Sequence, residues 1–325
     1  MNERRGFVEQ MTLGDVDAIR IVEWHEPFIP TADVFPEMDS GVWSDNANDL
    51  APDHWDQARD LTVIALQSWI LRSAGRTVLL DTGAGNDRER PGMAPFFHRR
   101  ESDFPGLLAR AGIRPDDVDI VINTHLHVDH VGWNTRNVDG QWVPTFPRAT
   151  YLIPAADDAH YGPDNAAGTG LQEVDRLIYD DSVAPVHRAG LSERWDGWYR
   201  IDENLVLESA PGHTPGSCVL RLRSRSDRAV FAGDVLHSPA QILRPCCSSA
   251  FCHDPAQAAD TRRRILGRAA DERELLVPAH FGGAGALEVR RAGVAFALGK
   301  WAALSPFQPG RAGRRCAAAW RHRNE

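Results

Sequence analysis

The stretch VINTHLHVDHVGW, residues 121–133, concentrates potential metal ligands at the end of an apolar segment. Three histidines and one aspartate lie within six consecutive positions: His125, His127, Asp129 and His130. The apolar run over residues 118–122 that leads into the stretch is predicted to be a buried strand. Burying four titratable groups in so short a segment is costly unless they have partners. The pattern therefore predicts a metal site.

The spacing within this stretch suits two metal ions. On an extended segment, side chains two positions apart point to the same side, so His125 and His127 can bind one ion together. Asp129 and His130 follow where the chain turns, and they can reach a second position. Neutral imidazole and carboxylate are ligands for Zn²⁺, Mn²⁺, Fe²⁺ and Co²⁺. Four side chains underfill two sites, so we expect one more histidine for each ion and a bridging carboxylate.

Candidates for the missing ligands follow three later segments of the chain. His213 lies in the tight loop PGHTPG, Asp234 in AGDV after an apolar strand, and His280 in PAHF after another. A rigid sheet aims the loops at its strand ends, which is where functional residues of α/β proteins gather. We expect these side chains to meet residues 125–130 at one rim of the sheets.

Strand-length apolar segments recur along the chain and are interrupted by helical ones. The predicted strands cover residues 15–24, 61–71, 76–80, 118–122, 149–153, 205–209, 218–222, 229–232 and 275–277. Helices are predicted over residues 104–112, from residue 155, and from Asp254, an N-cap followed by a proline at the first helical position. Two halves of strands and helices predict an α/β fold in which two sheets pack together and helices lie outside.

These motifs, taken in order, resemble the metallo-β-lactamase superfamily. The DTG turn at residues 81–83, THLHVDH, PGHTPG, AGDV and PAHF all match, over roughly residues 60–285. The resemblance implies an αββα four-layer sandwich of two mixed β-sheets flanked by helices, with a dinuclear metal site at one edge. Asp234 would bridge the two ions. The remaining ligands implied by the resemblance form two sets. One ion is bound by His125, His127 and His213, and the other by Asp129, His130 and His280.

Differences within the family narrow the expected reaction. Electron-transfer members carry glutamate where this chain has His127, and β-lactamases lack a bridging aspartate at the position of Asp234. The aromatic N-terminal segment and GDVLHSPAQ, residues 233–241, most resemble acyl-homoserine lactonases and methyl-parathion-hydrolase-like enzymes. The expected reaction is the opening of a lactone or ester. Alternatives are organophosphate triester hydrolysis, glyoxalase-II-like thioester hydrolysis, and a non-hydrolytic metal-binding or redox role.

Two divalent ions that share a water lower its pKa toward ~7, which provides a metal-bridging hydroxide at neutral pH. Zinc is the expected ion, with manganese, cobalt and iron as alternatives. We expect Asp129 to carry a proton to the leaving group. Asp81 is expected to hold the outer N–H of a metal-bound histidine, with a turn-stabilising role as the alternative. Trp133 and His237 are candidates for the pocket wall. The alternative for Trp133 is packing in the core, and the alternative for His237 is a loop histidine with its own hydrogen-bond partners.

The remaining histidines and cysteines lack the spacing of ligands. His160 is expected to be a structural or surface residue, whereas for His253 a loop histidine with its own partners is expected and a ligand or substrate contact is the alternative. Cys246, Cys247 and Cys252 are expected to be small buried thiols, because their spacing does not suit a closed zinc site.

The composition bounds the class of protein and its partners. A chain of 325 residues, 42% of them hydrophobic, can bury a large core. The net charge of −9 disfavours nucleic acid, so the expected partner is a small-molecule substrate. No apolar run approaches the ~18–20 residues of a membrane span, and the first residues predict no signal peptide. Five cysteines without a CxxC pair predict a reducing cytoplasm.

One hydrolase domain is expected over residues 1–304, and its first 60 residues or so form an N-terminal extension. This extension either covers the pocket or pairs with a second subunit of a homodimer. The Arg-, Gly- and Pro-rich tail over residues 305–325 is expected to be poorly ordered, although a final docking strand is an alternative.

Overall fold

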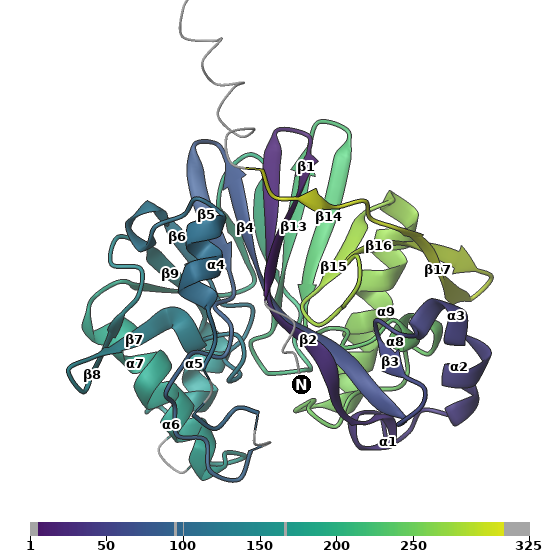
Figure 1. Ribbon diagram of the computed structural model, residues 1–325, viewed down its shortest axis with the longest axis horizontal. Helices are drawn as coiled ribbons and strands as arrows, with labels where there is room; N and C mark the ends of the chain where they lie inside the picture. Colours follow the sequence, from purple (N-terminus) through teal and green to yellow (C-terminus); the bar gives the residue numbers. More distant parts are fainter. Residues whose placement is uncertain (1–5, 94–95, 100, 166–167, 309–325) are drawn as a thin grey trace, which may run out of the picture.

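The structure is a computed structural model and describes residues 6–93, 96–99, 101–165 and 168–308. Two β-sheets occupy its centre, and helices flank them on either side (Figure 1). The strands of the first sheet are β1 (Phe7–Leu13), β2 (Val16–Pro30), β3 (Trp55–Asp56), β4 (Leu61–Ser73), β5 (Arg76–Leu80), β6 (Ile120–Ile122), β9 (Thr150–Pro154), β10 (Ser192–Trp195) and β18 (Ser305–Pro306). Their order is β10-β9-β6-β5-β4-β2-β1-β18, and β3 pairs with β4.

The second sheet is formed by the later part of the chain. In both spatial and chain order its strands are β11 (Trp198–Arg200), β12 (Leu205–Ser209), β13 (Cys218–Ser224), β14 (Asp227–Gly233), β15 (Leu275–Pro278), β16 (Leu287–Ala292) and β17 (Ala295–Trp301). β14 and β15 are parallel and the other neighbours antiparallel. The first sheet is also mixed, because β5, β6, β9 and β10 pair in parallel. β7 (Thr135–Val138) and β8 (Gln141–Pro144) form a separate hairpin.

The helices fall into three groups (Figure 1). Beside β5, β6 and β9 lie α4 (Phe104–Arg110), α5 (Ala155–Tyr161), α6 (Glu173–Ser182) and α7 (Ala184–Arg188). On the other flank, beside β14 to β16, lie α8 (Ala240–Leu243) and α9 (Pro255–Glu272). Near these, α1 (Thr31–Val34), α2 (Ser40–Asp45) and α3 (Ala47–Leu50) form a small N-terminal group. Two 3₁₀ turns, η1 (Pro115–Asp117) and η2 (Gly132–Asn134), flank β6 in the sequence.

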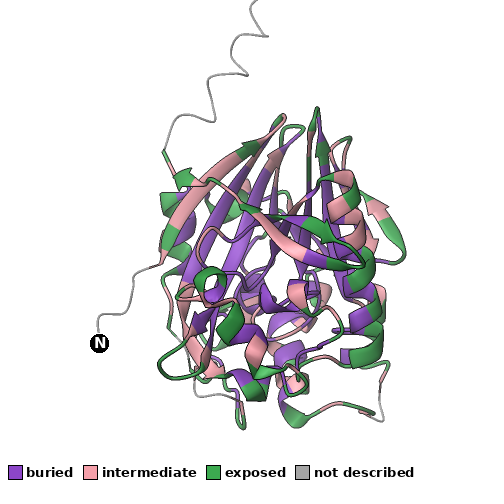
Figure 2. Ribbon diagram, turned by 90° about the vertical axis from the view of Figure 1, so that its right-hand side faces the viewer, coloured by how far each residue is buried: buried purple, intermediate pink, exposed green. Residues whose placement is uncertain are grey.

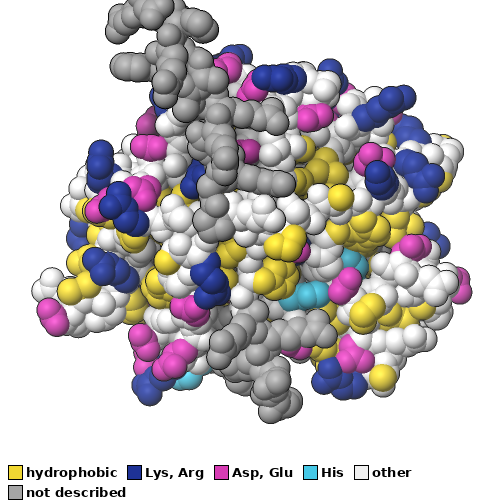
Figure 3. All heavy atoms as spheres, turned by 45° about the horizontal axis from the view of Figure 1, so that its top comes forward, with side chains coloured by type: hydrophobic (Ala, Val, Ile, Leu, Met, Phe, Trp, Pro, Cys, Tyr) yellow, Lys and Arg dark blue, Asp and Glu magenta, His cyan; other side chains and the backbone are white. Residues whose placement is uncertain are grey.

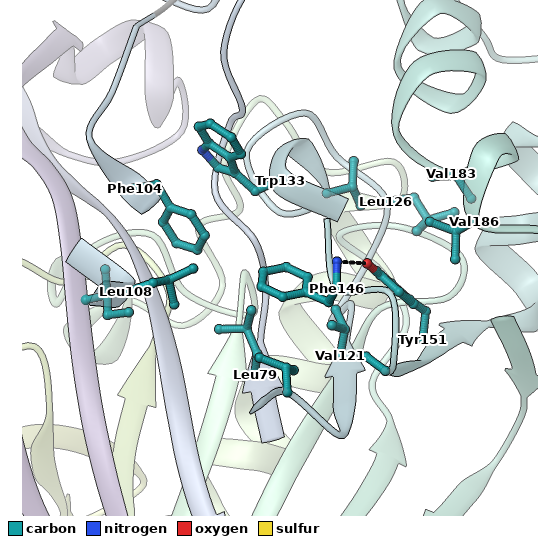
Figure 4. Close-up of a cluster of buried hydrophobic side chains, with 14 of the residues drawn as sticks. Leu79, Phe104, Leu108, Val121, Leu126, Trp133, Phe146, Tyr151, Val183 and Val186 are labelled. Atoms are coloured by element: carbon teal, nitrogen blue, oxygen red, sulfur yellow. Dashed lines mark hydrogen bonds between the residues drawn. The ribbon is translucent and has the colours of Figure 1, made fainter. Parts of the chain in front are cut away.

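Successive side chains of a strand point to opposite faces of its sheet, and this alternation explains the four layers. In β5, Val78 and Leu80 pack between the sheets, whereas Leu79 faces the cluster that includes Phe104 of α4. Figure 4 shows this outer cluster, and Figure 2 shows that the central strands are largely buried while the outer helices expose residues. In β14, Phe231 faces the first sheet and Val230 faces α9. The predicted αββα sandwich of two mixed sheets is therefore confirmed.

Both ends of the described chain are built into the first sheet. β2 pairs antiparallel with β4 from Asp17 opposite Arg72 to Pro30 opposite Leu61, so the first 60 residues supply strands of the sandwich. β18 pairs with β1 through Ser305. The tail therefore begins as a short docked strand, and residues 309–325 lie outside the described residues. No helix among those described is long and apolar enough to cross a bilayer.

A buried histidine makes the stability of this fold depend on pH. The ring of His54 stacks on Trp301 at 5.2 Å between centroids, and burial, helped by His25 and Arg20, lowers the pKa of His54 to about 3. The unfolded chain therefore takes up a proton below pH ~6.5 that the folded chain does not bind. Stability from this group is present above pH 6.5 and is lost as the pH falls, by up to ~1.4 kcal/mol per unit.

Urea unfolding of metal-free protein at pH 6.5 and 5.0 measures this effect. We expect a His54→Phe variant to show a smaller loss of unfolding free energy between these two pH values than the wild type. Equal losses in both proteins would contradict the assignment.

Candidate metal centre

Loops that follow four strands bring the predicted ligands together. Residues 125–130 follow β6, whereas His213, Asp234 and His280 follow β12, β14 and β15. Groups of three of these side chains place their ligand atoms within 4.8 Å of one another. The groups are His125 with His127 and His213, His125 with His130 and Asp234, Asp129 with His130 and His280, and His213 with Asp234 and His237.

The first set of ligands gathers around two loops. His213 Nε2 lies 2.9 Å from His127 Nδ1. Asp234 Oδ2 lies 3.3 Å from His213 Nε2 and 3.7 Å from His125 Nε2. These atoms face a common point, so three imidazoles and one carboxylate oxygen can share a cation there.

The second set lies on the other side of the same carboxylate. Asp234 Oδ1 is 3.3 Å from His130 Nε2, and Asp234 Oδ2 is 3.0 Å from His280 Nε2. The Asp129 carboxylate lies 3.6 Å from both His130 Nε2 and His280 Nε2. Asp234 therefore stands between the two sets, which is the position a bridging carboxylate needs.

The donor atoms themselves fit divalent cations. Within the described residues, His125 Nε2, His130 Nε2 and Asp234 Oδ1 are buried without a hydrogen-bond partner. Buried polar atoms are nearly always satisfied, so several unsatisfied ones facing each other call for a missing partner. Nitrogen and carboxylate oxygen are the ligand types preferred by first-row divalent metals.

Protonation in this cluster depends on burial and on the aspartates. Burial, with the neighbouring imidazoles, keeps the pKa values of His125 and His213 well below the usual range, so both rings are neutral and able to bind a metal. Burial also lowers the pKa of His280, but the Asp234 carboxylate outweighs it and raises the pKa to about 9. A metal must therefore displace a proton from His280.

Outer contacts fix the orientation of several rings. Asp81, which follows β5 with a φ of 56°, places Oδ2 2.9 Å from His130 Nδ1. It also accepts hydrogen bonds from the backbone N–H and the hydroxyl of Thr124, both at 2.8 Å, and that hydroxyl lies 3.1 Å from His125 Nδ1. On the opposite side, His280 Nδ1 lies 3.0 Å from the carbonyl oxygen of Ala65. Such contacts set the tautomer and direction of a metal-binding imidazole.

A cavity of about 410 Å³ opens over this cluster. Metal-ligand candidates from both sets line it, together with His237, whose Nε2 lies 3.3 Å from Asp234 Oδ2. The hydrophobic part of the lining comes from Phe28, Val34, Ile64, Met93, Phe97, Val128, Ile178, Ala250 and Phe251. The cavity thus joins polar, cation-binding chemistry to an extensive apolar wall.

Several residues lie elsewhere than expected. Trp133 does not line this cavity, because the η2 turn carries its ring into the core, where it stacks on Phe104 at 5.8 Å (Figure 4). His160, expected to be a structural or surface residue, and His253, expected to be a loop histidine with its own partners, line the cavity with their rings 4.9 Å apart. Cys246, expected to be buried, is exposed.

The sequence did not predict that two further cavity residues, Tyr161 and Cys252, would lie beside the candidate metal ligands. Tyr161 ends α5, and its hydroxyl lies 3.1 Å from His127 Nε2, on the far side of the ring from His213. Cys252 lies with its Sγ 3.7 Å from His213 Nδ1. Neither residue belongs to a motif, and each reaches the site only because the chain folds back, so the sequence carries no local signal for them.

Residues 61–280 match the model of the Metallo-beta-lactamase superfamily, and the chain belongs to that family. N-acyl homoserine lactonase AttM from Azorhizobium caulinodans is 34% identical over 115 residues, which is 32% of this chain and 36% of that protein. Ribonuclease TTHA0252 from Thermus thermophilus is 25% identical over 186 residues, or 54% of this chain and 36% of that protein. The chain thus spans about a third of the length of both relatives.

The solved structure of AidC, a dizinc quorum-quenching lactonase in complex with a product, superposes with a TM-score of 0.73. The two chains are 17% identical, and the match covers 92% of this chain and 99% of that one. This likeness shows the fold. The family match and the lactonase relative support a hydrolase.

Proposed function

We propose that this protein is a hydrolase that uses two divalent cations, zinc by preference, to open a lactone or cleave a carboxylic ester. The observation that supports this proposal most strongly is the position of Asp234. Its two oxygens face both histidine sets, and neither set is satisfied by protein hydrogen bonds alone. When bound, the cations supply Lewis-acid polarisation of the substrate oxygen and a water of lowered pKa.

The chain's own residues would then position the substrate and move a proton. Asp129 borders the cavity and lies beside His130 and His280 of the second set, so its carboxylate is placed to deliver a proton to the leaving group. His237 borders the same space, and an N–H of its ring can donate a hydrogen bond to the reacting carbonyl oxygen.

The lining of the cavity supports an apolar acyl group in the substrate. Phe28, Phe97 and Ile178 belong to the hydrophobic part of this lining, and apolar surface recognises acyl chains through burial. Acidic and basic side chains are interspersed over the face shown in Figure 3, a distribution unlike the basic stripe of a nucleic-acid-binding protein.

A hydrolysis screen of zinc-loaded protein at neutral pH tests the proposal. It compares acyl-homoserine lactones, aryl esters, a glutathione thioester, a phosphotriester and a phosphodiester. A kcat/KM of ~10⁴ M⁻¹s⁻¹ or more on lactones or esters supports the proposal. Efficient turnover of the phosphodiester, phosphotriester or thioester alone would overturn the substrate assignment. Fewer than two bound ions in the active protein would overturn the dinuclear centre.

Substitution of Phe251 tests the role of the apolar wall. Its side chain borders the cavity and is 41% exposed, so truncation should leave the fold intact. We expect Phe251→Ala to lower kcat/KM by ~10-fold on long acyl chains, because a few methylene contacts contribute ~1–3 kcal/mol, and to leave short-chain esters nearly unchanged. Trp198→Ala, which removes an exposed aromatic outside the cavity lining, is the matched control. Equal losses on long and short chains would contradict this assignment.

A further inference from the structure

A buried carboxylate ties together two of the loops that hold the metal ligands. Asp157 lies in the first turn of α5 and is completely buried. Its Oδ2 accepts hydrogen bonds from the backbone N–H of Leu126, at 3.0 Å, and from the hydroxyl of Thr214, at 2.9 Å. Its Oδ1 accepts from the backbone N–H of Gly216 at 2.5 Å. All three partners are donors, which an ionised carboxylate can satisfy at once.

These partners adjoin the first set of ligands. Leu126 stands between His125 and His127, and Thr214 directly follows His213. The two loops come from different sheets, after β6 and β12, and Asp157 belongs to neither. One side chain therefore fixes the separation of three imidazoles that must converge on one ion.

The approach of the second loop to α5 is too close for a side chain. A Cβ atom at position 216 would lie 2.5 Å from the backbone nitrogen of Asp157, so glycine is required there. Burying a carboxylate is costly unless its hydrogen bonds are all made. Here burial raises the pKa of Asp157 to about 6, against the three hydrogen bonds that lower it, so the group is ionised at neutral pH.

We propose that Asp157 is a positioning residue that holds His125, His127 and His213 at the separation needed by the first metal ion. This inference rests on the proposed dinuclear function. It assigns a role in metal binding to Asp157, which is neither one of the candidate ligands nor part of the cavity lining. Residues that orient metal ligands typically change metal affinity ~10–100-fold when removed.

The next residue in the chain is a matched control. Asp158 is also buried, and its carboxylate accepts a hydrogen bond from the Tyr179 hydroxyl and lies beside His187 Nε2, both at 2.8 Å. These partners lie on α6 and α7 and do not belong to the loops after β6 and β12 that Asp157 joins. Loss of Asp158 should destabilise the fold to a similar extent without moving the metal ligands.

The experiment measures zinc affinity and does not depend on turnover. Wild type, Asp157→Ala and Asp158→Ala are loaded with zinc, and transfer to a chromogenic chelator is followed together with the melting temperature of the metal-free proteins. We expect Asp157→Ala to bind one of two ions ~10–100-fold more weakly, and Asp158→Ala to bind both as wild type does.

Substitution of Thr214 provides a second route if Asp157→Ala does not fold. Thr214→Val removes one of the three hydrogen bonds to Asp157, and we expect it to lower the affinity for one of the two zinc ions roughly fivefold. Thr214→Ser keeps the hydroxyl and should retain wild-type affinity. Two tightly bound ions in the folded Asp157→Ala variant, or in Thr214→Val, would overturn this inference alone. A wild type that binds no zinc would overturn the proposed function as well.

Discussion

Replacement of Asp234 by alanine is expected to abolish metal binding and hydrolysis together. Its Oδ2 lies 3.3 Å from His213 Nε2 and 3.0 Å from His280 Nε2, so one carboxylate serves both ligand sets. Alanine leaves the buried imidazoles of the first set facing one another without the carboxylate that lies beside them. We expect kcat/KM to fall by ~10²–10⁴-fold, because removal of one partner from a buried charged cluster costs ~3–5 kcal/mol.

Metal analysis of the purified variant, alongside its activity, measures this effect. Zinc should raise the melting temperature of the wild type, through binding to the folded state, and should leave that of Asp234→Ala unchanged. Asp227→Ala is the matched control. Asp227 begins strand β14, at the end of the strand opposite to Asp234, and accepts a hydrogen bond from the Gly14 N–H. Full zinc occupancy in Asp234→Ala would refute the bridging role.

The fold could be predicted because its determinants are local. Strands buried on both faces appear as apolar runs, such as residues 118–122, and several of these runs end where a His- or Asp-bearing motif begins. The order of five motifs then indicated the sandwich. The loops that follow these strands place His213 beside His125 in one group, and His280 beside Asp129 and His130 in another.

The surroundings of the site were less predictable, because they depend on contacts between distant segments. Asp157 meets Leu126 across 31 positions and Thr214 across 57, and its AADD context resembles a solvated helix start. His160 reaches the cavity for the same reason. Trp133 shows the opposite case. It was a candidate for the pocket wall because it directly follows a motif in the sequence, but the η2 turn directs it into the core, which was the alternative.

Asp129 offers the sharpest test of chemistry as distinct from metal binding. Its carboxylate lies 3.6 Å from His130 Nε2 and from His280 Nε2, and it also borders the cavity. The side-chain amide introduced by Asp129→Asn keeps an oxygen that can bind a cation, but it cannot carry a proton between water and the leaving group. We expect both ions to remain bound and kcat to fall by ~10²–10⁴-fold on lactones.

The dependence on the leaving group separates the two roles of Asp129. A lactone expels an alkoxide, which must be protonated as it leaves, whereas a nitrophenyl ester expels a stable phenoxide that needs no proton. The loss in Asp129→Asn should therefore be large for lactones and small for nitrophenyl esters. Asp175→Asn is the control, because Asp175 borders the same cavity, accepts a hydrogen bond from the Gln172 N–H, and belongs to none of the groups that could hold a cation among the described residues. If Asp129→Asn lost one ion and slowed both substrates equally, Asp129 would be a metal ligand without a role in proton transfer. Loss of a cation slows both reactions, whichever leaving group is expelled.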